Sequence, residues 1–203
     1  MQLRLPWTGT SDQYVTQKAW QGASLERCPR HPEGGCGFES KGYYPRKEPP
    51  GTLVARYYCP PAHETYSLLP DCLAAKVPGT LAELEEAVVR VEQSASQEEA
   101  VGTLRIDTTL PAVLRWLRRR LPLVRAGLLA LVEVVAVPGL HERPPTVTGL
   151  REALGTTAAL QRVRELGAAH LDALPPPLGF GRRPLRRGKA RGTFPHDMGT
   201  DPP

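Results

Sequence analysis

Cysteine and histidine side chains gather in two short segments near the start of the chain. Cys28 and His31 stand three positions apart and Cys36 follows, while Cys59 and His63 form a second pair. Prolines stiffen both segments, and the stretch between them is long enough for a β-hairpin. Thiolates and imidazoles on two tight turns are the donors that hold a tetrahedral zinc ion in a zinc ribbon. The pattern therefore predicts a metal site that helps residues 26–78 to fold.

Five donors compete for four coordination positions. The spacing of Cys28 and His31 favours that pair, whereas the softness of thiolates and the two glycines before Cys36 favour Cys28 with Cys36. We expect the ligands Cys28, Cys36, Cys59 and His63, with His31 as the alternative. Because three thiolates leave no obvious open coordination position, we expect the zinc ion to be structural.

The remaining cysteine, Cys72, lies in an apolar run, so we expect it in the core rather than on the metal. The four cysteines of the chain could instead form two disulfides. No apolar run in residues 1–14 resembles a secretory signal, so we expect reduced thiols in a cytoplasmic, nucleoid-associated protein.

Composition limits the architecture to small folded units. The 203 residues include 22 prolines and 19 glycines, too many for one continuous core. We expect a small α+β protein with an N-terminal extension of unassigned role (1–25), a zinc ribbon of short antiparallel strands (26–78), a helix-turn-helix-like helical domain (79–137), a linker with amphipathic helices (138–178) and a disordered basic tail (179–203). The apolar stretch 121–137 contains Arg125 and Glu133 and lies between prolines, so we interpret it as a buried helix and expect no membrane span.

Periodicity places the elements that must carry these residues. Alternation in 52–58 and 65–69 predicts strands, and a helical period begins after a capping box formed by Thr80 and Glu83. A short helix is expected over 97–105, a break over 106–109, and a helix over 110–121 that Pro122 ends or kinks. A further helix is expected over 123–137, and an amphipathic pair interrupted near Gly155 follows.

Arginine supplies most of the positive charge. The net charge is +5 and the isoelectric point is about 9.2, and the planar guanidinium suits phosphates and guanine edges. The short helix, the break and the helix over 110–121 match the outline of a helix-turn-helix. Its apolar stripe would pack inward, which leaves a set of arginines for DNA: Arg115, Arg118, Arg119, Arg120 and Arg125. An ordinary helical bundle with a solvated arginine face is the alternative.

Several motifs together resemble the N-terminal zinc ribbon of bacterial insertion-sequence transposases. They are Cys28-Pro29-Arg30-His31, Gly42 to Arg46, Arg56 to Pro60 and His63 to Asp71. The segment from Gln97 to Arg120 is similar to the helix-turn-helix that follows such ribbons. The chain departs from the family pattern at Ala62, where the second knuckle often has a cysteine.

Such transposases cut DNA with three carboxylates on an RNase-H-like sheet, but after Gly79 this sequence predicts only helices and a tail. The resemblance therefore implies the DNA-binding part without the nuclease. We expect a protein with no catalysis that binds double-stranded DNA, with a transposase or a second copy of itself as further partners, and with no membrane or small-molecule substrate. A protein-interaction module is one alternative. A zinc hydrolase with Glu64 or Asp71 as the base is the other.

Overall fold

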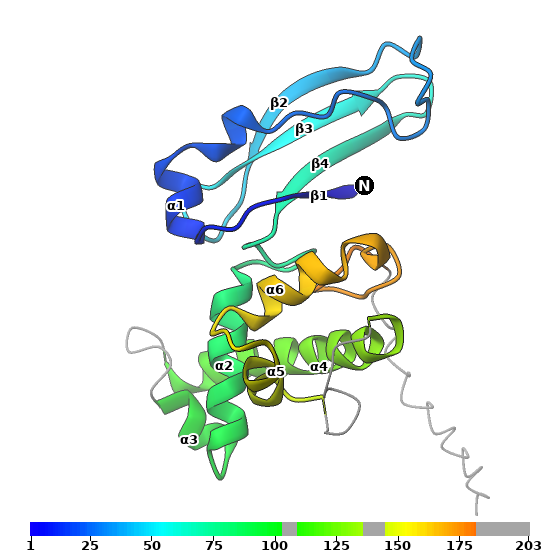
Figure 1. Cartoon of the computed structure of the whole chain (residues 1–203). Helices are drawn as coiled ribbons and strands as arrows, with labels where there is room; N and C mark the ends of the chain where they lie inside the picture. Colours follow the sequence, from blue (N-terminus) through cyan, green and yellow to red (C-terminus); the bar gives the residue numbers. More distant parts are fainter. Residues whose placement is uncertain (103–108, 136–144, 182–203) are drawn as a thin grey trace, which may run out of the picture.

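A four-stranded sheet lies at one end of the molecule and a group of helices lies at the other (Figure 1). The structure is a computed structural model, and it describes residues 1–102, 109–135 and 145–181. Strands fill the first part of the chain and helices the second, so the α+β class expected from the sequence is confirmed at this level. In the described part of the chain, no helix is both long and apolar enough to cross a membrane.

The sheet draws on more of the chain than the predicted ribbon. Strands β2 (Glu39–Pro45), β3 (Leu53–Cys59) and β4 (Glu64–Pro70) form an antiparallel meander. Strand β1 (Gln2–Leu5) pairs with β4 in parallel, which gives the order β1-β4-β3-β2. The first 25 residues, which the sequence left without a role, therefore supply an edge strand of the same sheet.

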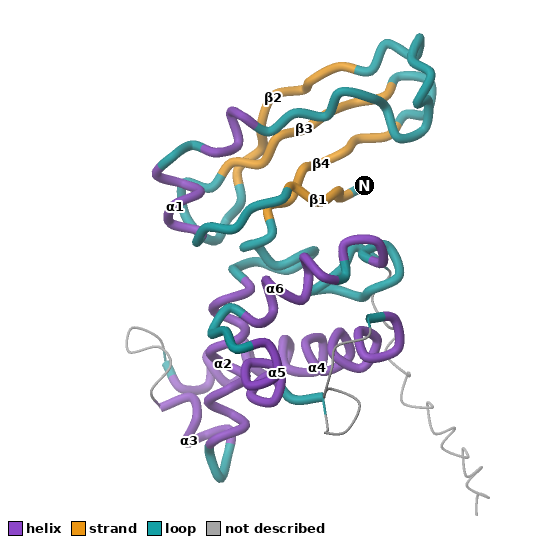
Figure 2. The backbone as a smooth tube through the Cα atoms, in the orientation of Figure 1, coloured by secondary structure: helices purple, strands orange, loops and turns teal. Residues whose placement is uncertain are grey.

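One face of the sheet is covered by the segment that joins β1 to β2. This segment contains helix α1 (Ser11–Thr16), the 3-10 turn η1 (Ala19–Gly22) and a long loop that crosses in front of the sheet (Figure 2). The Tyr57 hydroxyl donates to the Ala23 carbonyl at 3.3 Å, and Ala23 packs against Ala55 and Leu68. Because side chains alternate along a strand, Arg56 and Tyr58 lie on the opposite face.

The helical part consists of α2 (Leu81–Gln93), α3 (Gln97–Gly102), α4 (Leu110–Val134), α5 (Val147–Leu154), α6 (Ala159–Leu166) and the 3-10 turn η2 (Ala168–His170). The predicted capping box is present: the Glu83 amide donates to the Thr80 hydroxyl and the Thr80 amide to the Glu83 carboxylate, both at 3.0 Å. The predicted interruption is also confirmed, because Gly155 ends α5 with a φ of +61°.

Two carboxylates of α2 cap the helices that follow. Glu92 accepts from the amides of Val147 and Thr148 at the start of α5. Glu85, which is buried, accepts from the Ala159 and Leu160 amides at the start of α6. Unsatisfied amides and the positive end of the helix dipole attract negative charge. Helix α2 thus fixes where α5 and α6 begin.

Helix α4 continues through Pro122, so the expected end of one helix and start of another at this point is wrong. Pro122 is exposed, and the carbonyl of Arg118 that loses its usual donor can bind water instead. The buried positions keep a helical period on both sides of the proline: Val113, Leu117, Leu121, Val124, Leu128 and Leu131. Burial of this continuous stripe stabilises the helix by more than Pro122 destabilises it. Of the predicted break over 106–109, residues 106–108 lie outside the described residues.

Arg164 of α6 joins the sheet end to the helices. Its side chain is fully buried, and burial lowers its pKa to about 10, so it remains charged at neutral pH. The guanidinium donates to five backbone carbonyls, those of Pro70, Asp71, Leu73, Pro177 and Leu178. The first three lie at the end of β4 and in the turn after it, and the other two belong to the segment after η2, so one side chain ties three parts of the chain together.

The start of the predicted tail is packed rather than disordered. Phe180 belongs to the main hydrophobic core, and a Cβ at Gly179 would lie 2.2 Å from the Leu174 carbonyl oxygen. Only glycine therefore fits this close approach. The Lys76 amine donates to the carbonyls of Phe180 and Gly181. The rest of the predicted tail, 182–203, lies outside the described residues.

Replacing Arg164 with methionine should lower the free energy of unfolding by about 3 kcal/mol or more, because buried carbonyls would lose their donor. Urea denaturation followed by tryptophan fluorescence measures the change. Arg162→Met on the exposed side of the same helix is the matched control and should cost far less. Equal losses in the two variants would contradict the role assigned to Arg164.

Candidate metal centre

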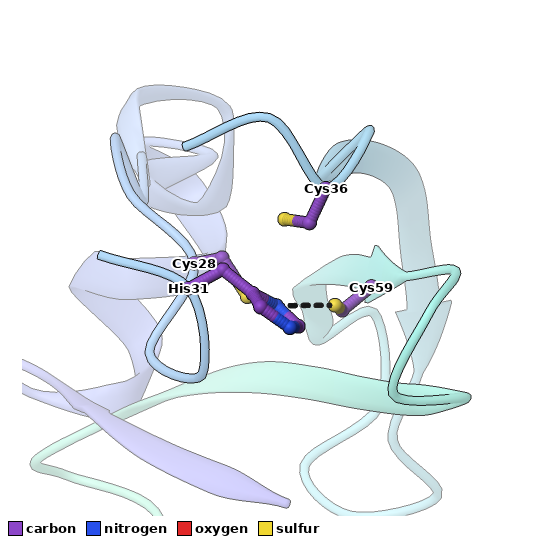
Figure 3. Close-up of side chains that lie close together, drawn as sticks. All are labelled: Cys28, His31, Cys36 and Cys59. Carbon is purple, nitrogen blue, oxygen red and sulfur yellow. Dashed lines mark hydrogen bonds between the residues drawn. The ribbon is translucent and has the colours of Figure 1, made fainter. Parts of the chain in front are cut away.

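Three cysteines and one histidine converge where the long loop meets the end of β3 (Figure 3). Cys28 and His31 come from one tight turn, which the His31 amide closes by donating to the Cys28 carbonyl at 3.2 Å. Cys36 follows two glycines with positive φ, Gly34 and Gly35, which let the loop turn back toward the sheet. Cys59 is the last residue of β3 and points to the covered face.

The ligand atoms of these four residues all lie within 4.8 Å of one another. His31 Nδ1 is 3.3 Å from Cys59 Sγ and 3.6 Å from Cys28 Sγ. Tetrahedral zinc with its usual bond lengths separates a sulfur and a nitrogen ligand by about 3.6 Å. All four cysteines of the chain are free thiols. The group could therefore hold one metal ion with little rearrangement.

The cluster lies in a small core of its own. Cys28, Cys36 and Cys59 are buried together with Tyr66, and Phe38 stacks on Tyr57 at its side. Burial excludes water from a bound ion and leaves no open coordination position in a four-ligand set. This arrangement suits a structural ion better than one that activates water.

The pKa values of Cys28 and Cys59 are shifted in opposite directions. Burial raises the pKa of Cys28, but hydrogen bonds from the His31 side chain and from the amides of Arg30 and His31 outweigh it and bring the pKa to about 6. Burial and the neighbouring thiols instead raise the pKa of Cys59. One negative charge is thus accommodated readily and a second is resisted. A divalent cation would relieve that repulsion, because it stabilises each additional thiolate.

A hydrogen-bonded network outside the four residues holds the first turn against β4. Arg30 donates to both carboxylate oxygens of Glu64, at 2.9 and 3.1 Å, and the buried Tyr66 hydroxyl donates to Glu64 at 2.6 Å. The Arg30 and Tyr66 hydrogen bonds bring the pKa of Glu64 to about 2. The sequence analysis gave Glu64 a role only as the possible base of a zinc hydrolase. Its place in this network favours a positioning role instead.

His63 is not part of the group that the structure assembles, and His31 takes its place. The structure therefore groups His31, the alternative ligand, with the three thiols in place of the preferred His63. His63 lies in the β3–β4 turn with a φ of +50°, and its Nδ1 is 3.3 Å from the Tyr58 hydroxyl. Tyr58 and Cys59 are neighbours on a strand, so their side chains point to opposite faces of the sheet. His63 contacts Tyr58 and therefore lies on the face that Cys59 does not share. The Cys28–His31 spacing was the sequence signal that favoured His31.

The other predicted residues are placed as follows. Cys72 is buried in the main core, where burial raises its pKa to about 12, so it stands apart from the metal group. Asp71 accepts from Arg4 and from the Trp7 amide, which ties β1 to the turn after β4. Neither residue joins the four clustered ligands.

The predicted DNA-contacting arginines lie along α4. Arg115, Arg118, Arg119 and Arg125 are exposed, and Arg118 also pairs with Glu98 of α3 at 3.2 Å. Arg120 is half-buried and stacks over the Trp116 ring at 4.5 Å. Four of the five predicted residues therefore face solvent.

Comparisons with known proteins assign no family to the chain. No protein-family model matches it, and neither a curated protein nor a solved structure is significantly similar to it.

His31→Ala should weaken metal binding strongly, because it removes a ligand that has no nearby substitute. His63→Ala, the matched control, should leave metal content and affinity unchanged. Native mass spectrometry gives the metal content, and competition with a chromophoric chelator gives the affinity. If His63→Ala loses the ion and His31→Ala keeps it, the ligand set assembled here is wrong.

Proposed function

We propose that the chain is a non-catalytic DNA-binding protein in which zinc holds the sheet together and α4 contacts duplex DNA. The observation that carries the proposal is the division of α4 into two faces. One face is a continuous buried apolar stripe, and the other exposes Arg115, Arg118, Arg119 and Arg125. Packing of the stripe therefore needs none of these arginines, and they can turn to phosphates or base edges. Arg118 would exchange its ion pair with Glu98 for such a contact.

The surroundings of α4 support this orientation. Val113 and Leu117 of α4 pack against Ala87 of α2 and Val101 of α3 in one small cluster. A short helix followed by a longer helix, both supported by a third, is the arrangement in which a recognition helix presents its outer face to a groove. The Arg118–Glu98 ion pair links α3 to the start of that outer face.

Zinc is the proposed ion because of the donor set. Three thiolates and one imidazole are soft or borderline ligands, which select zinc over magnesium or calcium. Cys28, His31, Cys36 and Cys59 would hold it, with His31 bound through Nδ1. The ion would supply folding energy by fixing the long loop against β3.

The origin proposed from the sequence is insertion-sequence transposases, and the support for it remains the resemblance of the motifs. In that setting a transposase or a second copy of the chain would share the DNA. A protein-interaction module is the second candidate, because Leu129 follows Arg125 on the outer face of α4 and is 58% exposed. Phosphate-driven binding weakens steeply with salt, whereas an apolar protein interface does not.

Removal of zinc should loosen the metal end of the sheet and spare the helices. The cluster core contains Cys28, Cys36, Cys59 and Tyr66, and it is separate from the core that holds α2 and α4. After chelation, hydrogen exchange should accelerate over residues 23–38 and 59–64 while 81–93 and 110–134 stay protected. Unchanged exchange over 23–38 would contradict a structural ion.

The triple variant Arg115→Ala, Arg118→Ala, Arg119→Ala should lose most of its affinity for duplex DNA. Each lost phosphate contact should also lower the salt slope of binding by about 0.9. Circular dichroism and zinc content should match the parent, since these residues lie outside the buried stripe. Fluorescence anisotropy with a labelled duplex measures the affinity.

The control variant removes three positive charges from exposed residues elsewhere: Arg27, Lys47 and Arg162 to alanine. It should bind nearly as well as the parent. A folded α4 variant that binds like this control would rule out α4 as the DNA-contacting helix.

A further inference from the structure

The sheet has a second face, opposite the one that the long loop covers. On this face lie Arg56 and Tyr58 of β3, with Ser67 and Thr65 of β4 directly opposite them. Tyr44 of β2 also belongs to it, because it pairs with Val54, which alternates onto the same side. Arg56, Tyr58, Thr65 and Ser67 are half-buried. Within the described residues, none of these four belongs to a hydrophobic core cluster.

Cations and aromatic rings alternate on this open face. The Lys41 amine lies 5.6 Å from the centre of the Tyr58 ring, and the Arg56 guanidinium lies 5.8 Å from the centre of the Tyr44 ring. Glu39 pairs with Lys41 at 2.7 Å and offsets part of the positive charge. Tyr44 packs against the main hydrophobic core and Arg56 lies over its ring. The face therefore offers the ring of Tyr58, two cations and the hydroxyls of Thr65 and Ser67.

We propose that this open face binds single-stranded DNA. Bases stack on aromatic rings whatever their sequence, and neighbouring cations attract the phosphates between them. Tyr58 stands opposite Thr65, two positions along β3 from Arg56 and Ser67, a separation of about 7 Å. Arg56 can therefore reach a phosphate next to a base stacked on Tyr58.

The width of the sheet favours a single strand over a duplex. Four strands at about 4.8 Å spacing span about 14 Å, whereas the major groove is about 12 Å wide and admits a helix or a two-stranded ribbon. Bases in a duplex are stacked on each other and cannot turn onto rings on a flat face. The unpaired bases of a single strand can turn onto such rings.

The choice of DNA over RNA rests on the proposed function, in which α4 contacts duplex DNA. A protein that holds a duplex at α4 would have its sheet available to a strand that opens nearby. The two surfaces use different residues and different chemistry, so either proposal can be wrong while the other holds.

The experiment measures binding of a labelled 12-nucleotide oligodeoxythymidine to the full, zinc-loaded chain by fluorescence anisotropy. Tyr58→Leu should weaken binding about fivefold or more, since one stacked base contributes roughly 1–3 kcal/mol. Tyr43→Leu is the matched control: it is an exposed tyrosine of the same strand as Tyr44, but it pairs with Ala55 and so lies on the other face. It should bind like the parent.

A second variant does not depend on the ring. Arg56→Gln should lower the salt slope of oligothymidine binding by about 0.7, the value for one phosphate contact to a single strand. Circular dichroism and zinc content of each variant confirm that it folds. Oligouridine of the same length should compete more weakly than oligothymidine.

The proposal is overturned if the parent does not bind oligothymidine, or if Tyr43→Leu loses as much affinity as Tyr58→Leu. Equal binding of oligouridine would overturn the assignment to DNA. If the α4 triple variant also loses oligothymidine binding while Tyr58→Leu keeps it, the single strand binds at α4 and the sheet face is excluded. Loss of duplex binding alone in the α4 variant, with oligothymidine binding intact, supports two separate surfaces.

Discussion

The buried guanidinium of Arg164 sets how the two ends of this protein meet. A charge without partners in a protein interior costs several kcal/mol, so Arg164 can be buried only if carbonyl oxygens surround it. Five carbonyls do so, and they come from the end of β4 with the turn after it and from the segment after η2. Neither segment could move away without leaving the charge exposed to an apolar core. The sheet, α6 and the chain around Leu178 are thereby held in one arrangement.

The opposite end of the sheet is stabilised by different physics. There the long loop contains few apolar residues, and its buried cluster of cysteines and Tyr66 is small. Metal coordination can replace apolar burial in such a place, because a zinc ion links distant donors at once. The Arg30–Glu64 pair and the Tyr66 hydroxyl hold the first turn where His31 reaches the thiols. With a bound ion there and Arg164 at the other end, the sheet would be fixed at both ends, and the sheet face proposed to bind single-stranded DNA would be rigid.

Helix α4 combines a structural and a functional face. Its buried stripe contributes to two clusters, one shared with α2 and α3 and the other with the main core. Because those positions repeat with the helical period, the residues between them fall on the outer side and carry arginine instead. Arg120 departs from this division, since it lies back over Trp116 and covers part of that ring. The proposed DNA-binding face therefore begins at Arg115 and ends near Arg125.

The sequence alone determined the cysteines of the candidate metal site, the strands around Cys59, the capped start of α2 and the arginine side of α4. These depend on local spacing and period, which neighbouring residues define. Tertiary structure decided the rest. His31 rather than His63 joins the thiols because Cys59 and Tyr58 alternate across a strand. Pro122 stays inside α4 because a buried stripe continues past it, and Phe180 is packed because the main core has room for it. Each of these outcomes depends on contacts between residues far apart in the chain, which no local pattern contains.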